Sequence, residues 1–362
     1  MLERIRTLST IGFLLLIFAG LGNLAFHVLT NSDQDLSERL DTSWRSAMDG
    51  RLTGEIGRNI DKAMPNSKLL NGLIDGFVYQ TLGDTGPQVR EGCPGWFFLT
   101  EELVETPNGE AHLADRVKLA KAITAELARS DTALVVVPVP DKAQTLTGQE
   151  MCHLQSSAQA HKRFSEWNAR SEPLALLQVN IGKNWPRPGY WKTDTHWDQH
   201  GAQHAANQVA VAISQNIGAG STAMHLENCS RENIRPGDLV TLAGLGMTQD
   251  IFGPNMESEC PVKLKIERSG GLLDDAPEPD VLLAGSSYSL NSYFHDYLQA
   301  DSNREIVQKS QAGGGFAGAL LDILENNPQL LRKIKLVVWE WPVRSLTLPL
   351  TEQEKRFLSK DL

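Results

Sequence analysis

The chain has 362 residues, of which 41% are apolar and 22% charged, as expected for a globular protein that buries a core. Its formal net charge of −10 repels nucleic acid at long range and argues against a nucleic-acid function. The same charge fits a polyanionic substrate, such as a uronic-acid polymer, only if basic residues gather along the binding groove.

The N-terminus carries a topological signal. Arg4 and Arg6 precede an apolar stretch at residues 8–29, which is long enough to span a bilayer as a helix. Basic residues before the stretch favour a signal-anchor at residues 1–30, with the rest of the chain outside the cytoplasm. A cleaved signal peptide stays open as the alternative.

Residues 31–90 have the composition of a juxtamembrane segment. Apolar residues recur about every four positions between Leu36 and Ile60, which is typical of an amphipathic helix. Turn residues follow at 76–86, and we expect the main domain at residues 91–362.

Four cysteines are dispersed through the chain without a CxxC pair: Cys93, Cys152, Cys229 and Cys260. An even number outside the cytoplasm indicates two disulfides. Three pairings are possible, and buried free thiols are the alternative. No short spacing suggests a zinc site.

Beyond residue 91, short apolar runs alternate with longer helical patterns, which predicts an α/β fold whose mainly parallel sheet has helices on both faces. We expect an irregular insertion at residues 216–280. The predicted strands are residues 133–139, 174–179, 281–284, 306–308 and 334–341, and the predicted helices are residues 111–129, 156–170, 199–216 and 316–331.

Two segments carry the residue types of a hydrolytic triad. In Thr193-Asp194-Thr195-His196-Trp197, a carboxylate two residues before a histidine can hold the ring as a general base. In Gly285-Ser286-Ser287, a buried strand runs into a turn that can expose a hydroxyl to that base. Each segment alone is also compatible with an ordinary polar loop or helix cap.

Three further features leave alternatives open. Gly313, Gly314 and Gly315 open a predicted helix and suit either an oxyanion hole or a plain loop. The aromatic residues around the Asp-His segment suit either a sugar platform or the core. These aromatic residues are Tyr190, Trp191 and Trp197. His196, His200 and His204 recur every four residues and could share a metal, although no HExxH glutamate is present.

Taken together, these segments resemble the alginate O-acetyltransferase family of the AlgJ and AlgX type. Six short blocks occur in the family's order between about residues 90 and 345. They are Gly95-Trp96-Phe97-Phe98-Leu99, Pro140-Asp141-Lys142, Thr193-Asp194-Thr195-His196-Trp197, Gly285-Ser286-Ser287-Tyr288-Ser289, Gly313-Gly314-Gly315 and Val338-Trp339-Glu340-Trp341-Pro342.

The resemblance implies an SGNH-hydrolase-like fold with a circularly permuted motif order. It implies that Ser287 is the nucleophile, His196 the base and Asp194 its orienting partner. Oxyanion or substrate contacts are expected from Gly314, Gly315, Tyr288, Lys192 and Trp197. Lys192 stands where the family commonly has Arg, which leaves the polymer open.

The implied activity is O-acetylation of an exopolysaccharide, alginate or similar, in the periplasm through an acetyl-serine. The implied partners are the polysaccharide acceptor, an integral membrane acyltransferase that supplies acetyl groups, and other polysaccharide-secretion proteins; no cofactor or metal is expected. The alternatives are a carbohydrate acetylesterase with the same triad and a non-catalytic polysaccharide-binding subunit.

Overall fold

The computed structural model describes residues 43–49, 51, 67–154, 157–227, 229–267 and 278–360. The chain divides into two units, residues 1–74 and residues 75–362. The predicted signal-anchor and the predicted amphipathic helix at residues 36–60 lie outside the described residues, except for residues 43–49 and 51. Within the described ranges, no helix has the length and apolar content needed to cross a bilayer.

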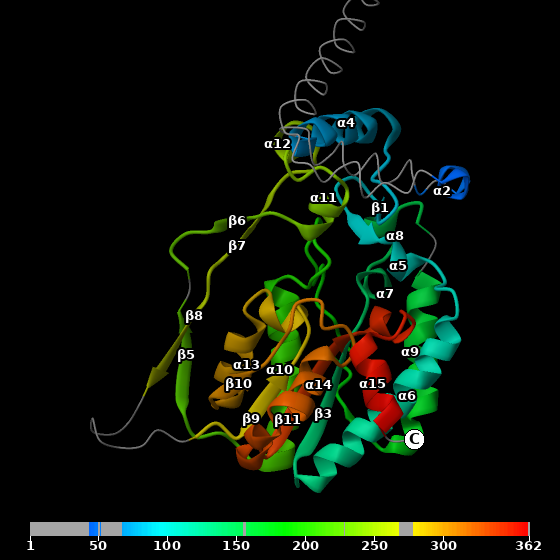
Figure 1. Ribbon diagram of the computed structural model, residues 1–362. Coiled ribbons are helices and arrows are strands. Elements are labelled where there is room, and N and C mark those ends of the chain that lie inside the picture. Colours follow the sequence, from blue (N-terminus) through cyan, green and yellow to red (C-terminus); the bar gives the residue numbers. More distant parts are fainter. Residues whose placement is uncertain are drawn as a thin grey trace, which may run out of the picture. The chain divides into compact units, whose positions relative to one another are not determined.

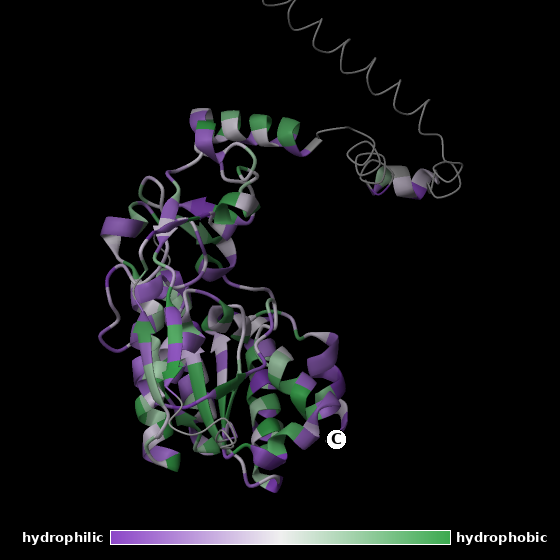
Figure 2. Cartoon of the chain, turned by 90° about the vertical axis from the view of Figure 1, so that its left-hand side faces the viewer, coloured by the Kyte–Doolittle hydropathy of each residue, from purple (hydrophilic) through white to green (hydrophobic). Residues whose placement is uncertain are grey.

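Residues 1–74 contribute α2 (Trp44–Met48) and the start of α4 (Ser67–Leu82), which continues into the second unit. Trp44 and Met48 are 79% and 71% exposed, so neither belongs to a core here. Further along, α4 carries apolar side chains that are also exposed, among them Phe77 and Leu82. The hydropathy colouring shows hydrophobic and hydrophilic residues mixed along this helix (Figure 2).

The second unit is built on a five-stranded sheet, parallel throughout, with the strand order β10-β9-β11-β3-β4 (Figure 1). Its strands are β3 (Ala133–Val139), β4 (Leu177–Gln178), β9 (Val281–Ala284), β10 (Ile306–Gln308) and β11 (Leu336–Pro342). All residues of β9 and β11 are buried, because helices cover both faces of the sheet.

Successive side chains of each central strand serve opposite cores. On one face, residues such as Val135 and Val338 pack with α10 (Gln199–Ile217) and α13 (Phe294–Ser302). On the other face, residues such as Val136 and Trp339 pack with three helices: α6 (Gly109–Arg129), α9 (Ser157–Ser171) and α14 (Gly318–Asn326). The predicted α/β fold with a parallel sheet and helices on both faces is therefore confirmed.

Most predicted elements have boundaries within two residues of the observed ones, and two elements differ more in extent. Strands were expected at residues 174–179, where β4 covers only Leu177–Gln178. A single helix was expected at residues 316–331, but α14 ends at Asn326 and η3 (Pro328–Lys333) follows, because Pro328 lacks the N–H that a continuing helix needs. Other short helices are α5 (Thr100–Leu103), α7 (Lys142–Thr145), α8 (Gly148–Met151), η1 (Glu172–Leu174), η2 (Tyr288–Leu290), η4 (Val343–Leu346) and α15 (Glu352–Lys360).

The insertion at residues 216–280 is more regular than predicted. It forms two antiparallel ribbons, β5 (Ala223–Glu227) with β8 (Lys263–Glu267) and β6 (Asn233–Arg235) with β7 (Glu257–Glu259). Two short helices, α11 (Asp238–Leu242) and α12 (Gln249–Phe252), lie between β6 and β7 in the chain. A third ribbon pairs β1 (Val89–Glu91) with β2 (Phe97–Leu99).

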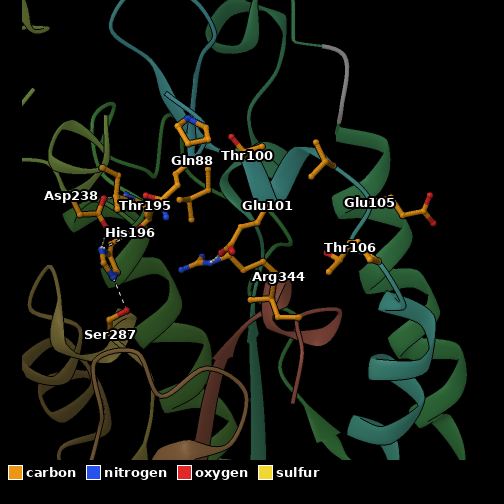
Figure 3. A pocket seen from close by; sticks show the side chains of 16 residues that line it. Gln88, Thr100, Glu101, Glu105, Thr106, Thr195, His196, Asp238, Ser287 and Arg344 are labelled. Atoms are coloured by element: carbon orange, nitrogen blue, oxygen red, sulfur yellow. Dashed lines mark hydrogen bonds and ion pairs between the residues drawn. The ribbon is translucent and has the colours of Figure 1, made fainter. Parts of the chain in front are cut away.

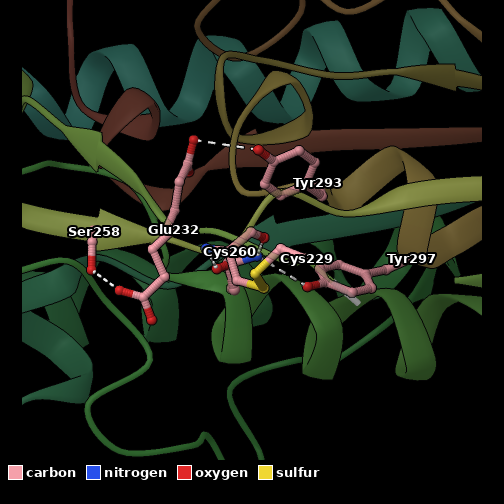
Figure 4. The surroundings of a disulfide bond; sticks show 8 residues. Cys229, Glu232, Ser258, Cys260, Tyr293 and Tyr297 are labelled. Carbon is pink, nitrogen blue, oxygen red and sulfur yellow. Dashed lines mark hydrogen bonds between the residues drawn. A yellow bond between two sulfur atoms is a disulfide. The ribbon is translucent and has the colours of Figure 1, made fainter. Parts of the chain in front are cut away.

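All four cysteines form disulfides, which confirms the prediction of two bonds. Cys93 pairs with Cys152, and Cys229 pairs with Cys260. The second bond lies between the two ribbons of the insertion, since Cys229 stands between β5 and β6 in the chain and Cys260 between β7 and β8 (Figure 4).

Candidate active site

Ser287 lies in a tight turn that follows β9 at the carboxyl edge of the sheet. The buried carboxylate of Glu340, on β11, holds this turn. Its Oε2 accepts from the backbone N–H groups of Ser286 (2.8 Å) and Ser289 (3.1 Å) and from the Ser289 hydroxyl (2.7 Å), and its Oε1 accepts from the Ser286 hydroxyl (2.8 Å). Gly285 permits this close approach, since a Cβ there would lie 2.1 Å from Ser289 Oγ.

His196 and Asp194 lie in the loop between β4 and α10. His196 Nε2 is 2.8 Å from Ser287 Oγ, and His196 Nδ1 is 2.6 Å from Asp194 Oδ1. The same Oδ1 accepts the backbone N–H of His196 at 2.8 Å, which ties ring and carboxylate into one turn. Assigning the Nδ1 proton to the Asp194 bond leaves Nε2 free to accept from Ser287. The fold thus brings together three side chains from segments 91 residues apart.

The second carboxylate oxygen of Asp194 is also satisfied. Oδ2 accepts from the Arg235 guanidinium at 3.1 Å and from the Asp238 backbone N–H at 3.2 Å. Burial alone would raise the pKa of Asp194, but the hydrogen bonds from His196 and the charge of Arg235 outweigh it and hold the pKa well below its usual value. Asp194 therefore stays ionised opposite the imidazole.

Two carboxylates of the insertion, Glu257 and Asp238, accept hydrogen bonds from the Asp-His loop. Glu257 Oε1 accepts the Lys192 N–H at 2.8 Å, and its Oε2 accepts from the N–H and the hydroxyl of Thr193 at 2.9 and 2.7 Å. Asp238 accepts the N–H of Thr195 at 2.7 Å and its hydroxyl at 2.5 Å. Because carboxylates bind backbone N–H groups strongly, these contacts order the loop before any ligand arrives.

A buried lysine holds the same loop from the other side. Lys142 Nζ donates to the carbonyls of Phe97 (2.6 Å), Lys192 (2.8 Å) and Asp194 (3.1 Å), which uses all three of its protons. Burial lowers the pKa of Lys142 to about 8, although the charge of Glu102 acts in the opposite direction. Lys142, which begins α7 shortly after β3, therefore joins three backbone segments next to the site.

A cavity of about 560 Å³ opens over Ser287 and His196 (Figure 3). Arg344, from η4, also lines it; its Nε is 3.1 Å from Glu101 Oε1, and its Nη1 donates to the Tyr288 hydroxyl at 3.0 Å. Apolar walls come from Leu99, Val104, Leu242 and Leu348. The cavity thus places the hydroxyl and the imidazole next to both apolar and charged surface.

The aromatic residues near the Asp-His loop do not line this cavity. Trp197 is completely buried, with its ring 4.9 Å from that of Phe294 and 5.2 Å from that of Tyr288. Tyr190 and Trp191 are buried as well and border a different cavity. Tyr190 and Trp197 pack into the core on one face of the sheet, whereas Trp191 belongs to the wall of the second cavity.

The other expected substrate contacts also do not line the cavity over Ser287. Tyr288 is buried beneath His196, with the two ring centres 4.9 Å apart, and Lys192 borders the second cavity. Gly314 and Gly315 do not line the cavity over Ser287, and the Gly314 N–H donates to the Gln311 carbonyl at 3.0 Å. The glycines form a turn of their own, which does not support the expected oxyanion role.

The three histidines at four-residue spacing do not converge on an ion site. His200 is 81% exposed, and His204 Nε2 contacts two backbone carbonyls at 3.1 Å. Across the described ranges, the group of ligand-type side chains close enough to share an ion is Asp194, His196 and Asp238. Each of these side chains already has hydrogen-bond partners: Asp194 and His196 bond to each other, and the Asp238 carboxylate accepts from Thr195.

Several residues around the site went unrecognised in the sequence. Glu340 lies in β11, within the Trp-Glu-Trp-Pro block, and Arg344 lies two residues after that strand. The block was therefore a usable signal for both residues. Arg235 and Asp238 belong to the insertion, where no spacing or motif distinguishes them.

Comparison with known proteins gives a family match. The model described as "SGNH hydrolase-like domain, acetyltransferase AlgX" matches residues 89–343. The chain is 24% identical over 319 residues to the "Probable alginate O-acetylase AlgJ" of Pseudomonas aeruginosa, covering 83% of this chain and 81% of that protein. The protein of the same name from Azotobacter vinelandii is 25% identical over 314 residues, covering 83% and 80%.

Solved structures show the same fold. The O-acetyltransferase domain of Pseudomonas putida AlgJ matches with a TM-score of 0.65 and 21% identity, covering 76% of this chain and all of that one. Pseudomonas aeruginosa AlgX matches with a TM-score of 0.52 and 21% identity, covering 70% and 61%. Since the family model spans most of the chain, the chain belongs to the family of SGNH hydrolase-like acetyltransferase AlgX domains.

Proposed function

We propose that this acetyltransferase-family chain transfers acetyl groups to hydroxyls of an exopolysaccharide, with Ser287 as nucleophile, His196 as general base and Asp194 as the group that orients it. One observation carries the proposal: the Ser287 Oγ–His196 Nε2 and His196 Nδ1–Asp194 Oδ1 contacts of 2.8 and 2.6 Å end in a cavity. This is the order of groups that activates a serine for acyl transfer.

In the first half-reaction, Ser287 Oγ attacks the acetyl carbonyl carbon while His196 Nε2 takes the hydroxyl proton. The tetrahedral intermediate collapses, His196 returns the proton to the leaving group, and acetyl-Ser287 remains. The backbone N–H of Ser287 is one donor for the oxyanion. Arg344 lines the same cavity and supplies positive charge close to it.

In the second half-reaction, His196 takes the proton of an acceptor hydroxyl, whose oxygen attacks the acetyl-serine. Ser287 leaves with the proton from His196, and the acceptor carries a new acetyl ester. Apolar walls that restrict water favour transfer to the acceptor over hydrolysis. The AlgJ relatives are named probable alginate O-acetylases, which supports a polysaccharide acceptor.

The two disulfides support an oxidising, extracytoplasmic location such as the periplasm. An acceptor polymer there requires acetyl groups delivered across the membrane. We therefore include an integral membrane acyltransferase and other polysaccharide-secretion proteins among the proposed partners.

The test offers the full chain an acetyl ester together with an oligosaccharide acceptor and follows acetylation of the acceptor by mass spectrometry. Ser287→Ala should lose roughly 10⁴-fold or more of the rate. Ser302→Ala is the control, because its buried hydroxyl contacts backbone carbonyls away from the cavity. Acetate release without acceptor acetylation would indicate an acetylesterase, and full activity of Ser287→Ala would indicate a non-catalytic subunit.

A further inference from the structure

Arg235 links the two halves of the candidate triad. Its Nη2 donates to Asp194 Oδ2 at 3.1 Å and also to Asn291 Oδ1 at 3.0 Å. The Asn291 side-chain amide in turn donates to the carbonyl of Ser287 at 2.8 Å. One guanidinium nitrogen therefore connects the carboxylate behind His196 to the turn that carries the nucleophile.

The guanidinium is held in this place on its other sides. Its Nη1 donates to Glu259 Oε2 at 3.3 Å, and its carbon lies 5.3 Å from the centre of the Trp191 ring. Only 13% of the side chain is exposed. A planar group held by a carboxylate, an aromatic face and two acceptors has little rotational freedom left.

The backbone beneath Arg235 is fixed to the catalytic domain as well. Arg235 ends β6, which pairs with β7, and the Cys229–Cys260 bond closes this ribbon (Figure 4). Gln199, the first residue of α10, donates to the Cys260 carbonyl at 2.6 Å and accepts the Cys260 N–H at 2.7 Å. The insertion is thus pinned to the helix that directly follows the Asp-His loop.

We propose that Arg235 is a positioning residue, which sets the distance between the Asp194–His196 pair and Ser287 through its bonds to Asp194 and Asn291. The inference rests on the proposed function, because it assigns Arg235 a role through those three groups. Lysine cannot replace it fully, since a compact ammonium cannot contact Glu259 and the Asp194–Asn291 pair in the same plane.

The test measures hydrolysis of a small acetyl ester by full-length Arg235→Met and Arg235→Lys. We expect kcat to fall about 100-fold in the Met variant and about 10-fold in the Lys variant, with KM within about threefold of wild type. The rate at which a fluorophosphonate labels Ser287 should fall in parallel. If the Met variant does not fold, the Lys variant provides the test: kcat should fall while KM stays within about threefold of wild type.

Arg304→Met is the matched control. The Arg304 side chain is also 13% exposed and also pairs with a carboxylate, Asp280, but it contacts none of the three triad residues. This variant should lower the midpoint of thermal unfolding and leave kcat within about twofold of wild type. A comparable loss of kcat in Arg304→Met would show that general destabilisation explains the Arg235 result, and would overturn the inference.

A double variant separates positioning from other roles. If Arg235 acts through Asp194, then Asp194→Asn/Arg235→Met should be no more than about threefold slower than Asp194→Asn alone. The inference is overturned if the loss of kcat in the double variant equals the product of the losses in the two single variants, or if Arg235→Met has wild-type kcat. The proposed function survives either result as long as Ser287→Ala is inactive. An active Ser287→Ala would instead refute the proposed function itself.

Discussion

Replacing Glu340 should show how much the active-site turn depends on one buried carboxylate. Glu340 is 1% exposed and accepts from two backbone N–H groups and two hydroxyls, of Ser286 and Ser289. In Glu340→Leu the hydroxyls can turn to other partners, but the two backbone N–H groups cannot. Each unsatisfied buried donor costs about 1–3 kcal/mol, so we expect a loss of about 4 kcal/mol of folding free energy.

Glu340→Gln keeps an oxygen for the backbone N–H groups but removes the charge. Hydrogen bonds to a charged group contribute about 1 kcal/mol more than neutral ones. Three bonds to Oε2 are retained and each becomes weaker. Part of this loss is offset, because the cost of burying a charged carboxylate is removed; the same burial raises the pKa of Glu340 in the wild type. We therefore expect a net loss of about 1–2 kcal/mol for this variant.

Urea unfolding and hydrolysis of a small acetyl ester measure the two effects separately. We expect kcat to fall about 100-fold in Glu340→Leu and about 10-fold in Glu340→Gln, since displacement of the nucleophile by about 1 Å has this order of effect. Glu354→Gln is the control, because Glu354 is equally buried but pairs with Arg116 outside the cavity. Unchanged stability and kcat in Glu340→Leu would refute the reasoning. Lower stability with unchanged kcat would mean that Glu340 supports the fold and not Ser287.

Three further predictions concern other parts of the molecule. Burial raises the pKa of Glu102 from 4.5 to about 7. The contribution of this group to the free energy of unfolding is therefore complete below pH 4.5 and is lost as the pH rises to about 7. In Glu102→Gln, the urea midpoint should fall less over this pH range than in the wild type. Gly285→Ala should cost about 1–3 kcal/mol in urea unfolding and lower kcat, because the new Cβ would meet Ser289. Replacing Cys229 and Cys260 by Ser should cost about 4 kcal/mol, given their separation of 31 residues, and an unchanged urea midpoint would contradict this.

The main sheet was predictable because its signal is local. A strand covered on both faces is apolar at most of its positions, and the runs at residues 133–139, 281–284 and 306–308 coincide with β3, β9 and β10. The insertion gave no such signal, since its ribbons are held by backbone hydrogen bonds between partly exposed strands. Its composition alone indicated loops.

The sequence by itself determined the fold class, the number of disulfides and the residue types that meet at Ser287, because these follow from local patterns and short motifs. Only the tertiary structure decided which cysteines pair, that Trp197 belongs to the core, and that Gly314 stays away from the cavity. Contacts such as Glu340 with Ser286 and Arg235 with Asp194 join residues 54 and 41 positions apart. Their existence depends on strand order and ribbon placement, which neighbouring residues in the chain do not encode.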